Sequence, residues 1–478
     1  MKNDTTINIK NIIIIFINVI YILAFGIWAY ASWNNEFIIE NYENWIFIWI
    51  IPMIIVQLLS FVLKKIKTYD FVLWFTLLSY LFMFGRIFIK IFALNNKLAY
   101  DPYIYYNDSI LFHSYIYAIM SLILISFGYT LFFPSKSLVS NELSKINIDF
   151  NLYKTGKCMF ILGFVSKIIN DAKIISILQT TKSYISYTTA VSSGIFDDIS
   201  YLTLPGAFFM FFSGCMKEKR KKIMFVLLLA YFFLLTLLTG SRKIQLFSII
   251  TLFLGYRASE CKNKKVNIFK TVLSIFLGLF IINTLVIIRN NRFSLGNIFN
   301  QLTLNFLSFN TLKNLFGELC AESSMTLLTV ASTIKTVPSI LEFEYGKTLL
   351  RTIPSFLPIG WLVGDFFNKA TATYVINGYT TIPVGSSLIA TLYWNWGYIG
   401  GWIFAFIFGA LVSKININKN DIKINQREKM GMYFAIFSYL IILVRSDIFD
   451  IYRGLCYLFI SKYVIQKIIQ MKGAIKWI

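Results

Sequence analysis

The hydrophobic residues of this chain fall into long runs that alternate with short polar turns. A helix needs about 20 consecutive, mainly apolar residues to cross a bilayer, and about twelve runs approach that length. The fifth run is interrupted by Lys167, Asp171 and Lys173, and the eighth is short. The pattern predicts an all-α polytopic integral membrane protein with about twelve transmembrane helices. The expected spans are residues 11–32, 45–63, 69–92, 110–133, 157–176, 197–216, 223–240, 243–258, 268–288, 386–413, 430–447 and 450–469.

One long polar segment, residues 289–385, separates the ninth expected span from the tenth. The segment begins with two arginines and contains several carboxylates, and it is flanked on both sides by an expected apolar span. Within it, residues 302–333 have helical apolar spacing, so this part is expected to lie along the membrane surface or to dip into it. We therefore treat residues 1–478 as a single transmembrane domain with one large loop, in which chemistry or recognition is expected.

Basic charge is concentrated in alternate turns, and this concentration predicts the orientation of the chain. Cytoplasmic turns of membrane proteins are enriched in lysine and arginine. If the span count holds, the basic turns share one side, whereas the intervening turns carry glutamate or aspartate and little basic charge. Both termini are then cytoplasmic, and the loop at 289–385 is extracytoplasmic. The basic turns are residues 64–67, 217–222, 262–265 and 414–429.

Composition and motifs exclude several classes of protein. The chain is 57% hydrophobic and only 14% charged, which does not suit a soluble protein of this length. The basic turns explain the net charge of +22, so no nucleic-acid partner is expected. Walker, Rossmann and nucleophile-elbow motifs are absent from the sequence. The five cysteines show no paired spacing, and the single histidine, His113, has no ligands clustered around it. Neither a metal nor another cofactor is therefore expected.

Arginines at the outer ends of the expected spans are candidates for chemistry. A charged side chain near the membrane core costs about 2.5–3.5 kcal/mol on insertion scales, so it usually faces a partner or a water-filled cavity. Basic residues on the outer side also oppose the usual charge bias. An anionic ligand would explain them, because guanidinium groups bind phosphate oxygens in a two-pronged geometry. The candidates are Arg242, Arg289, Arg292, Arg351 and Arg445.

A simpler explanation exists for single arginines, whose heads can reach lipid phosphates or pair with nearby aspartates. It fits Arg453, which lies beside Asp450, and it also fits Arg86 and Lys90 in the third span. The outer arginines taken together favour a function.

Several carboxylates and the histidine are candidate bases for taking a proton from a hydroxyl group. Glu318 and Glu322 are four residues apart, hence on one face of a helix. Asp365 follows a turn that contains two prolines, and His113 lies near the outer end of the fourth span. Loop carboxylates are usually only solvated, and a hydrogen-bonded structural histidine is as good an explanation for His113. The choice of base stays open.

Three short segments occur in a characteristic order. Leu237-Leu-Thr-Gly-Ser-Arg242 contains a Gly-Ser-Arg turn, and Glu344-Tyr-Gly-Lys-Thr-Leu-Leu-Arg-Thr-Ile-Pro354 lies in the large loop. Tyr393-Trp-Asn-Trp-Gly397 then enters the tenth span. Together with the span pattern, these segments resemble the Wzy-class oligosaccharide repeat-unit polymerases of O-antigen and capsule assembly. Some members of that family carry a glycine ten residues beyond an outer-loop arginine, and the outer arginines of this chain lack that spacing.

The resemblance implies an enzyme of the bacterial plasma membrane. It would transfer a growing glycan from one undecaprenyl diphosphate carrier onto a newly delivered lipid-linked repeat unit, without a nucleotide sugar or a required metal. Its implied partners are the lipid-linked donor and acceptor, the bilayer, a chain-length regulator and a flippase. A flippase for the same lipids and a glycan ligase of similar architecture are the alternatives.

The implied roles fall on residues already singled out, because arginines can stabilise the charge that develops on a departing lipid diphosphate. The expected catalytic residues are Arg242, Arg289, Arg351, Arg445 and Glu322. The expected substrate-binding residues are Arg292, Glu318, Asp365, His113, Tyr393 and Trp394.

Overall fold

The computed structural model describes residues 2–94, 101–134, 149–181, 195–239, 243–260, 309–357, 360–380, 384–415 and 426–475. This part of the chain is helical and contains no strand. Five of its helices are long and apolar enough to cross a membrane, and each matches a predicted span. The larger count of about twelve spans stays a prediction. The five are α1 (Lys2–Ser32), α3 (Tyr42–Leu63), α4 (Phe71–Ile91), α5 (Asp108–Phe132) and α18 (Leu388–Ser413).

The other helical elements include long helices with more polar residues and several short pieces. The first half of the chain contributes α2 (Glu36–Glu40), η1 (Pro102–Tyr105), α6 (Phe150–Thr181), α8 (Ile195–Ser200), α9 (Thr203–Phe212), α10 (Glu218–Thr239) and α11 (Lys243–Ser259). The second half contributes α14 (Phe309–Thr336), α15 (Lys347–Thr352), η3 (Ile353–Phe356), α16 (Gly360–Asn368), α17 (Ala372–Asn377), α19 (Gln426–Leu440), η4 (Ile441–Arg445) and α20 (Ile448–Ile475).

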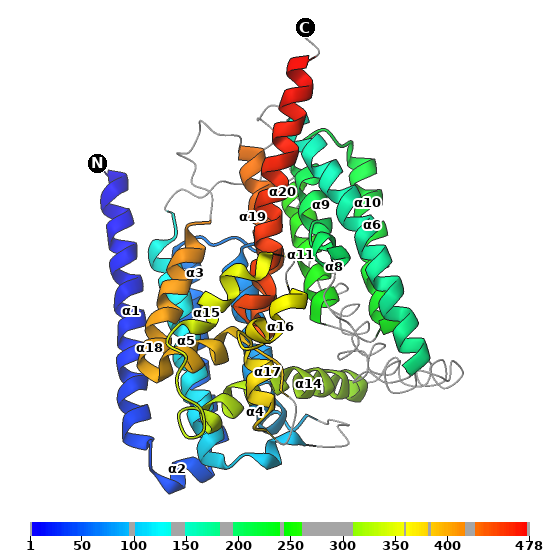
Figure 1. Ribbon diagram of the computed structural model, residues 1–478. Helices are drawn as coiled ribbons and strands as arrows, with labels where there is room; N and C mark the ends of the chain where they lie inside the picture. The colour runs from blue at the N-terminus through cyan, green and yellow to red at the C-terminus, as the bar shows by residue number, and fades with distance from the viewer. Residues whose placement is uncertain are drawn as a thin grey trace.

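The helices form a bundle in which α1 begins and α20 ends at the same, upper end of the view (Figure 1). The basic residues Lys64 and Lys65 follow α3 at this end, and Lys217 precedes α10 there as well. The sequence predicted that both termini and the basic turns share one side; the structure places the start of α1 and the end of α20 at one end of the bundle, and the common side of the basic turns stays a prediction. Assignment of that side to the cytoplasm stays a prediction.

Glycines allow α5 and α18 to approach each other closely. A methyl group on Gly128 of α5 would overlap the carbonyl oxygen of Phe406, and one on Gly409 of α18 would overlap that of Ile125. A side chain on Gly401 would likewise overlap the hydroxyl of Tyr117. In lipid, where apolar side chains gain little by leaving their surroundings, such backbone proximity is a main source of helix association. This seam fixes α18 against the centre of the bundle.

The large loop contributes a long helix, α14, whose axis runs crosswise to those of α1 and α5 in the view of Figure 1. The predicted helical segment at 302–333 is thus confirmed where the structure describes it. The helix packs against α4, where the backbone of Cys320 meets Gly85. Leu327 and Val330 are fully buried, so α14 is part of the protein core. Burial raises the pKa of the Cys320 thiol to about 12, which leaves it unreactive at neutral pH.

The predicted span at 197–216 is wrong as a single helix. The chain turns at Tyr201 and Leu202, which separate α8 from α9, and neither piece has the length needed to cross a bilayer. The turn lies next to a buried carboxylate, Asp198, which forms an ion pair with Arg453 of α20 at 2.6 Å. A window average of hydropathy cannot detect this break, because the partner is 255 residues away in the sequence.

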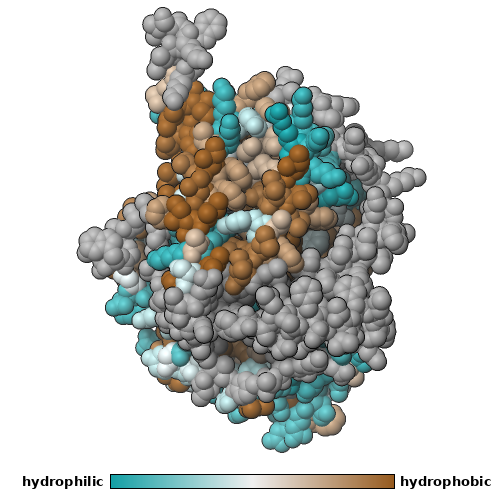
Figure 2. All heavy atoms as spheres, turned by 90° about the vertical axis from the view of Figure 1, so that its right-hand side faces the viewer, coloured by the Kyte–Doolittle hydropathy of each residue, from teal (hydrophilic) through white to brown (hydrophobic). Residues whose placement is uncertain are grey.

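The face that carries α6 and α10 is hydrophobic over much of its upper half, with hydrophilic side chains gathered near its upper edge (Figure 2). Exposed apolar side chains on α6 include Leu162 and Val165, and those on α10 include Leu227 and Leu234. Each of these side chains has more than half of its surface exposed. Such a surface suits contact with lipid chains and supports a multi-pass membrane protein.

Reporter fusions test the predicted orientation. Alkaline phosphatase, which folds only outside the cytoplasm, should be active when fused after Gly378 and inactive when fused after Lys221, since the basic turn is expected inside. A fusion after Lys67 is the matched inside control. Phosphatase activity in cells expressing the Lys221 fusion, at equal protein level, would reverse the orientation.

The α5–α18 seam makes a stability prediction. Gly409→Ala should lower the stability of the protein by about 1–3 kcal/mol, because the added methyl group forces the two backbones apart. Thermal unfolding in detergent, followed by loss of the monodisperse peak in size-exclusion chromatography, measures the effect. Gly364→Ala is the matched control, since a methyl group there meets nothing within 4 Å. Equal midpoints for the two variants would show that the seam tolerates a side chain.

Candidate functional site

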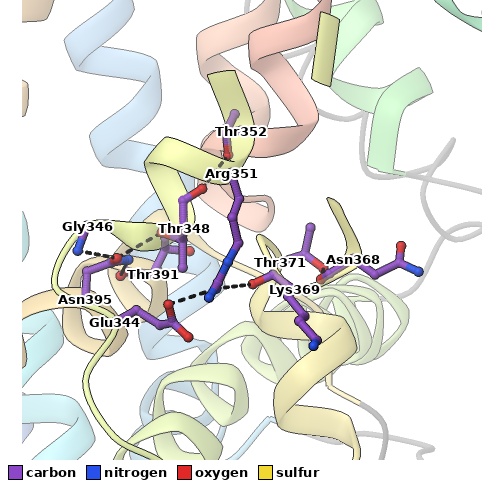
Figure 3. A network of polar contacts seen from close by, with 10 residues as sticks. All are labelled: Glu344, Gly346, Thr348, Arg351, Thr352, Asn368, Lys369, Thr371, Thr391 and Asn395. Atoms are coloured by element: carbon purple, nitrogen blue, oxygen red, sulfur yellow. Dashed lines mark hydrogen bonds and ion pairs between the residues drawn. The ribbon is translucent and has the colours of Figure 1, made fainter. Parts of the chain in front are cut away.

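Two of the three motif segments meet at Asn395 of α18 (Figure 3). The Asn395 Oδ1 accepts hydrogen bonds from the backbone N–H of Gly346 at 3.0 Å and from the hydroxyl of Thr348 at 2.9 Å. Its Nδ2 donates to the carbonyl oxygen of Thr391 at 2.8 Å. The side chain is fully buried. Because both ends of the amide are engaged, Asn395 fixes the start of α15 on the first turns of α18.

The backbone completes this junction. The N–H of Glu344 donates to the carbonyl oxygen of Trp394 at 3.1 Å, and the N–H of Tyr345 donates to that of Asn395 at 2.9 Å. These carbonyls precede a kink at Gly397, whose φ of 66° and ψ of −156° interrupt the helix. Gly346, with φ of 84°, turns the loop into α15. Both glycines adopt positive φ, a conformation that costs other residues free energy.

Arg351, on α15, is held between two other parts of the large loop. Its Nη1 donates to Oε2 of Glu344 at 2.8 Å and to the carbonyl oxygen of Lys369 at 3.1 Å (Figure 3). The side chains of Arg351 and Glu344 are each 20% exposed. The guanidinium therefore has a defined position and still reaches solvent. Asp365 lies on α16, one helical turn before Lys369, and its side chain is exposed.

The other candidates that the structure describes lie on other elements. His113 stacks on Trp33 with ring centroids 4.0 Å apart, and its Nε2 lies 3.2 Å from the Trp33 carbonyl oxygen. Arg445 ends η4, with its guanidinium carbon 5.9 Å from the ring centre of Phe82. Glu318 is half-buried on α14, the helix that also carries Glu322. These residues lie on elements other than α15, the helix that carries Arg351.

Tyr393 and Trp394 are buried next to Asn395, with 3% and 1% of their surfaces exposed. The Tyr393 hydroxyl donates to the carbonyl oxygen of Val337 at 3.2 Å, at the end of α14. The two rings thus pack where α14, the loop and α18 converge. Their packing supports a role in holding Asn395, and contact of either ring with substrate stays a prediction. Three further candidates, Arg242, Arg289 and Arg292, lie outside the described residues.

Glu344 and Asn395 were not among the predicted site residues, although both occur in the motif segments. Glu344 begins one segment and Asn395 is central to the other. The sequence signal that could have found them is the position of Asn395, a polar residue just before Gly397 at the start of an apolar span. A polar residue in such a span needs a hydrogen-bond partner. The partners Gly346 and Thr348 lie almost 50 residues earlier in the chain, so a single sequence does not identify them.

For three other basic residues the sequence favoured a structural explanation, such as pairing with a nearby carboxylate. Arg86 pairs with Asp101 and Lys90 with Glu43, so both serve structural ion pairs as expected. Arg453 pairs with Asp198 of α8, which is buried and needs a charged partner. Among the described residues no group of three or more His, Cys, Asp and Glu could hold a metal ion.

Comparison with known proteins identifies one family for this chain. No curated protein and no solved structure matches the chain. The family model described as O-antigen polysaccharide polymerase Wzy matches residues 11–472, which is nearly the whole chain. The protein is therefore a member of the Wzy O-antigen polysaccharide polymerase family, whose activity is the polymerisation of repeat units into polysaccharide.

Proposed function

We propose that this polymerase uses lipid diphosphate-linked oligosaccharides as both donor and acceptor, at the extracytoplasmic face of the bacterial plasma membrane and without a metal. In each cycle the bond between the donor sugar and its diphosphate breaks, and a hydroxyl of the acceptor glycan takes the sugar. The lipid diphosphate leaves with the bonding electron pair. The undecaprenyl carrier, a chain-length regulator and a flippase are the partners that the family implies.

The placement of Arg351 carries the proposal. The leaving diphosphate gains negative charge as the bond to the sugar breaks, and a cation that is already in position stabilises this charge most effectively. Glu344 and the carbonyl of Lys369 orient the guanidinium through Nη1. Little ordering is then required when the lipid binds. The contact should also strengthen in the transition state, where it contributes to turnover rather than to binding alone.

A structural role for the same pair predicts a different outcome. An ion pair at the surface contributes only about 0–1 kcal/mol to stability, and the Arg351–Glu344 pair is partly exposed. Removal of Arg351 would then change the amount of folded protein slightly and leave turnover intact. Measurement of turnover therefore separates the two roles. Arg242, Arg289, Arg292 and Arg445 stay candidates for further contacts with the diphosphate.

Arg351→Ala should lower the turnover of lipid-linked repeat units by at least about a hundredfold, the scale of losing one charge-stabilising donor. Affinity for the unreacted lipid should fall much less. The assay uses purified protein in detergent with a lipid diphosphate oligosaccharide and a chelator throughout, following chain length and lipid binding separately. Loss of wild-type activity in the chelator would overturn the metal-free part of the proposal.

Arg257→Ala is the matched control, because Arg257 also forms a partly exposed pair, with Glu260, at the end of α11. Its turnover should equal that of the wild type. If Arg351→Ala polymerises as fast as Arg257→Ala, Arg351 is a structural residue, and the donor site must be sought around the other arginines.

Asn395→Ala should reduce turnover, because the loop that carries Arg351 would shift although Arg351 is not substituted. The substitution leaves the buried hydroxyl of Thr348 and the half-buried N–H of Gly346 without their acceptor, and a buried donor that loses its partner costs about 1–3 kcal/mol. Hydrogen exchange measured by mass spectrometry should show faster exchange in residues 344–357 while α5 exchanges as in the wild type. Unchanged exchange in that segment would show that Asn395 does not hold the loop.

A further inference from the structure

A polar cavity of about 210 Å³ lies among α6, α8, α9, α10, α11 and α19. Its lining includes Lys167, Asp171 and Asp197, together with amide and hydroxyl groups. A single buried water requires only about 10–15 Å³, so the space far exceeds the needs of one solvent molecule. Close packing normally fills such a space with side chains. A charged cavity beside lipid-facing helices is instead a default candidate for a functional site.

The charges of the lining are unevenly neutralised. Lys167 pairs with Asp171 at 3.1 Å, and Asp171 also accepts a hydrogen bond from the hydroxyl of Tyr231. Asp197 accepts a hydrogen bond from Nδ2 of Asn170 at 3.1 Å. Among the described residues it forms no ion pair within 4 Å. The ion-paired Asp171 is therefore occupied, whereas Asp197 offers a carboxylate to a ligand.

The chemistry of the lining points to a neutral, hydroxyl-rich ligand. One lysine and two aspartates give the charged lining residues a net charge of −1, which disfavours a diphosphate. Carboxylate and amide groups can accept and donate hydrogen bonds with several hydroxyls at once. Tyr201, Phe232 and Tyr439 add aromatic surface to the lining. Polar groups that converge beside aromatic side chains can fix the orientation of a small ligand.

Contacts link this cavity to the segment that carries Arg351. Asp198 follows the cavity-lining Asp197 and pairs with Arg453 of α20 at 2.6 Å. One turn further along α20, the hydroxyl of Tyr457 lies 3.4 Å from Oδ2 of Asp198 and donates to the carbonyl oxygen of Phe356 at 2.9 Å. Phe356 ends η3, which continues directly from α15. The short helix α8 and the Arg351 segment are therefore tied to the same face of α20.

We infer that the cavity binds the terminal sugar of the acceptor glycan and that Asp197 takes the proton of its reacting hydroxyl. The inference rests on the proposed function and names the acceptor half of the same reaction. The acceptor oxygen forms a bond to the donor sugar, the bond from that sugar to the diphosphate breaks, and the diphosphate keeps the electron pair. The proton moves from the acceptor hydroxyl to the carboxylate of Asp197, which then returns it to solvent.

Asp197→Asn tests the inference with almost no change of shape. The amide cannot accept the proton, so turnover should fall by at least about a hundredfold, within the range for loss of a general base. The assay pairs the lipid diphosphate donor with a soluble octyl glycoside of the repeat unit as acceptor. Binding of the donor lipid should stay unchanged, in contrast to a defect at the diphosphate site. Asp108→Asn is the matched control, because Asp108 is an exposed carboxylate in the first turn of α5.

A second measurement uses the wild-type protein and does not depend on the folding of a variant. An octyl glycoside of the repeat unit with a photoreactive diazirine on its terminal sugar should label peptides of α6 or α8 upon illumination. Excess unlabelled glycoside should compete with this labelling. Labelling confined to residues 309–380, or wild-type turnover in Asp197→Asn, would show that the cavity holds water only.

The two proposals fail separately. If the wild-type protein elongates no lipid diphosphate donor, the proposed function is wrong. If the wild type elongates it and Asp197→Asn does so equally well, the proposed function stands and the acceptor cavity does not.

Discussion

The close backbone contact between α5 and α18 is the constraint on which the large loop depends. Gly128 and Gly409 bring the two helices within backbone reach, and in lipid this packing replaces the hydrophobic effect as the force that holds helices together. A fixed α18 then offers a stable support for Asn395. The loop needs such a support, because short helices such as α15 have too few residues to be stable on their own.

Polar groups specify how the loop sits on this support. Asn395 has donors and acceptors matched by Gly346, Thr348 and Thr391, so a shift of the loop by one residue would leave buried groups unpaired. A buried unpaired group costs about 1–3 kcal/mol, which exceeds the net gain from a typical hydrogen bond. The buried pair of Asp198 with Arg453 acts in the same sense, because loss of either partner is costly although the pair itself adds little stability. These contacts select one arrangement of the helices.

Sequence alone predicted those parts of the fold that depend on local patterns. The apolar runs of α3, α4, α5 and α18 were placed to within a few residues, and the helical spacing in the loop predicted α14. The break between α8 and α9 escaped it, because apolar residues surround Asp198 and its partner lies on α20. For the site, the motif segments were recognised, whereas the contact between Glu344 and Arg351 and the role of Asn395 depend on folding. Charges inside the interrupted fifth span were visible, but the cavity that they line requires five further helices.

The proposed donor and acceptor sites differ in the sign of their charge, and this difference has a consequence for a polymerase. On the proposed function each substrate carries a lipid diphosphate at one end and a glycan at the other, so one molecule could enter either site. In these proposals Arg351 attracts the diphosphate, whereas Asp197 repels it. Two like charges about 4 Å apart interact with about 4 kcal/mol at an effective dielectric constant of 20. A repulsion of this size corresponds to a factor of about a thousand in binding. Charge alone can therefore orient the two substrates, so that each cycle joins the reducing end of one glycan to the far end of the other.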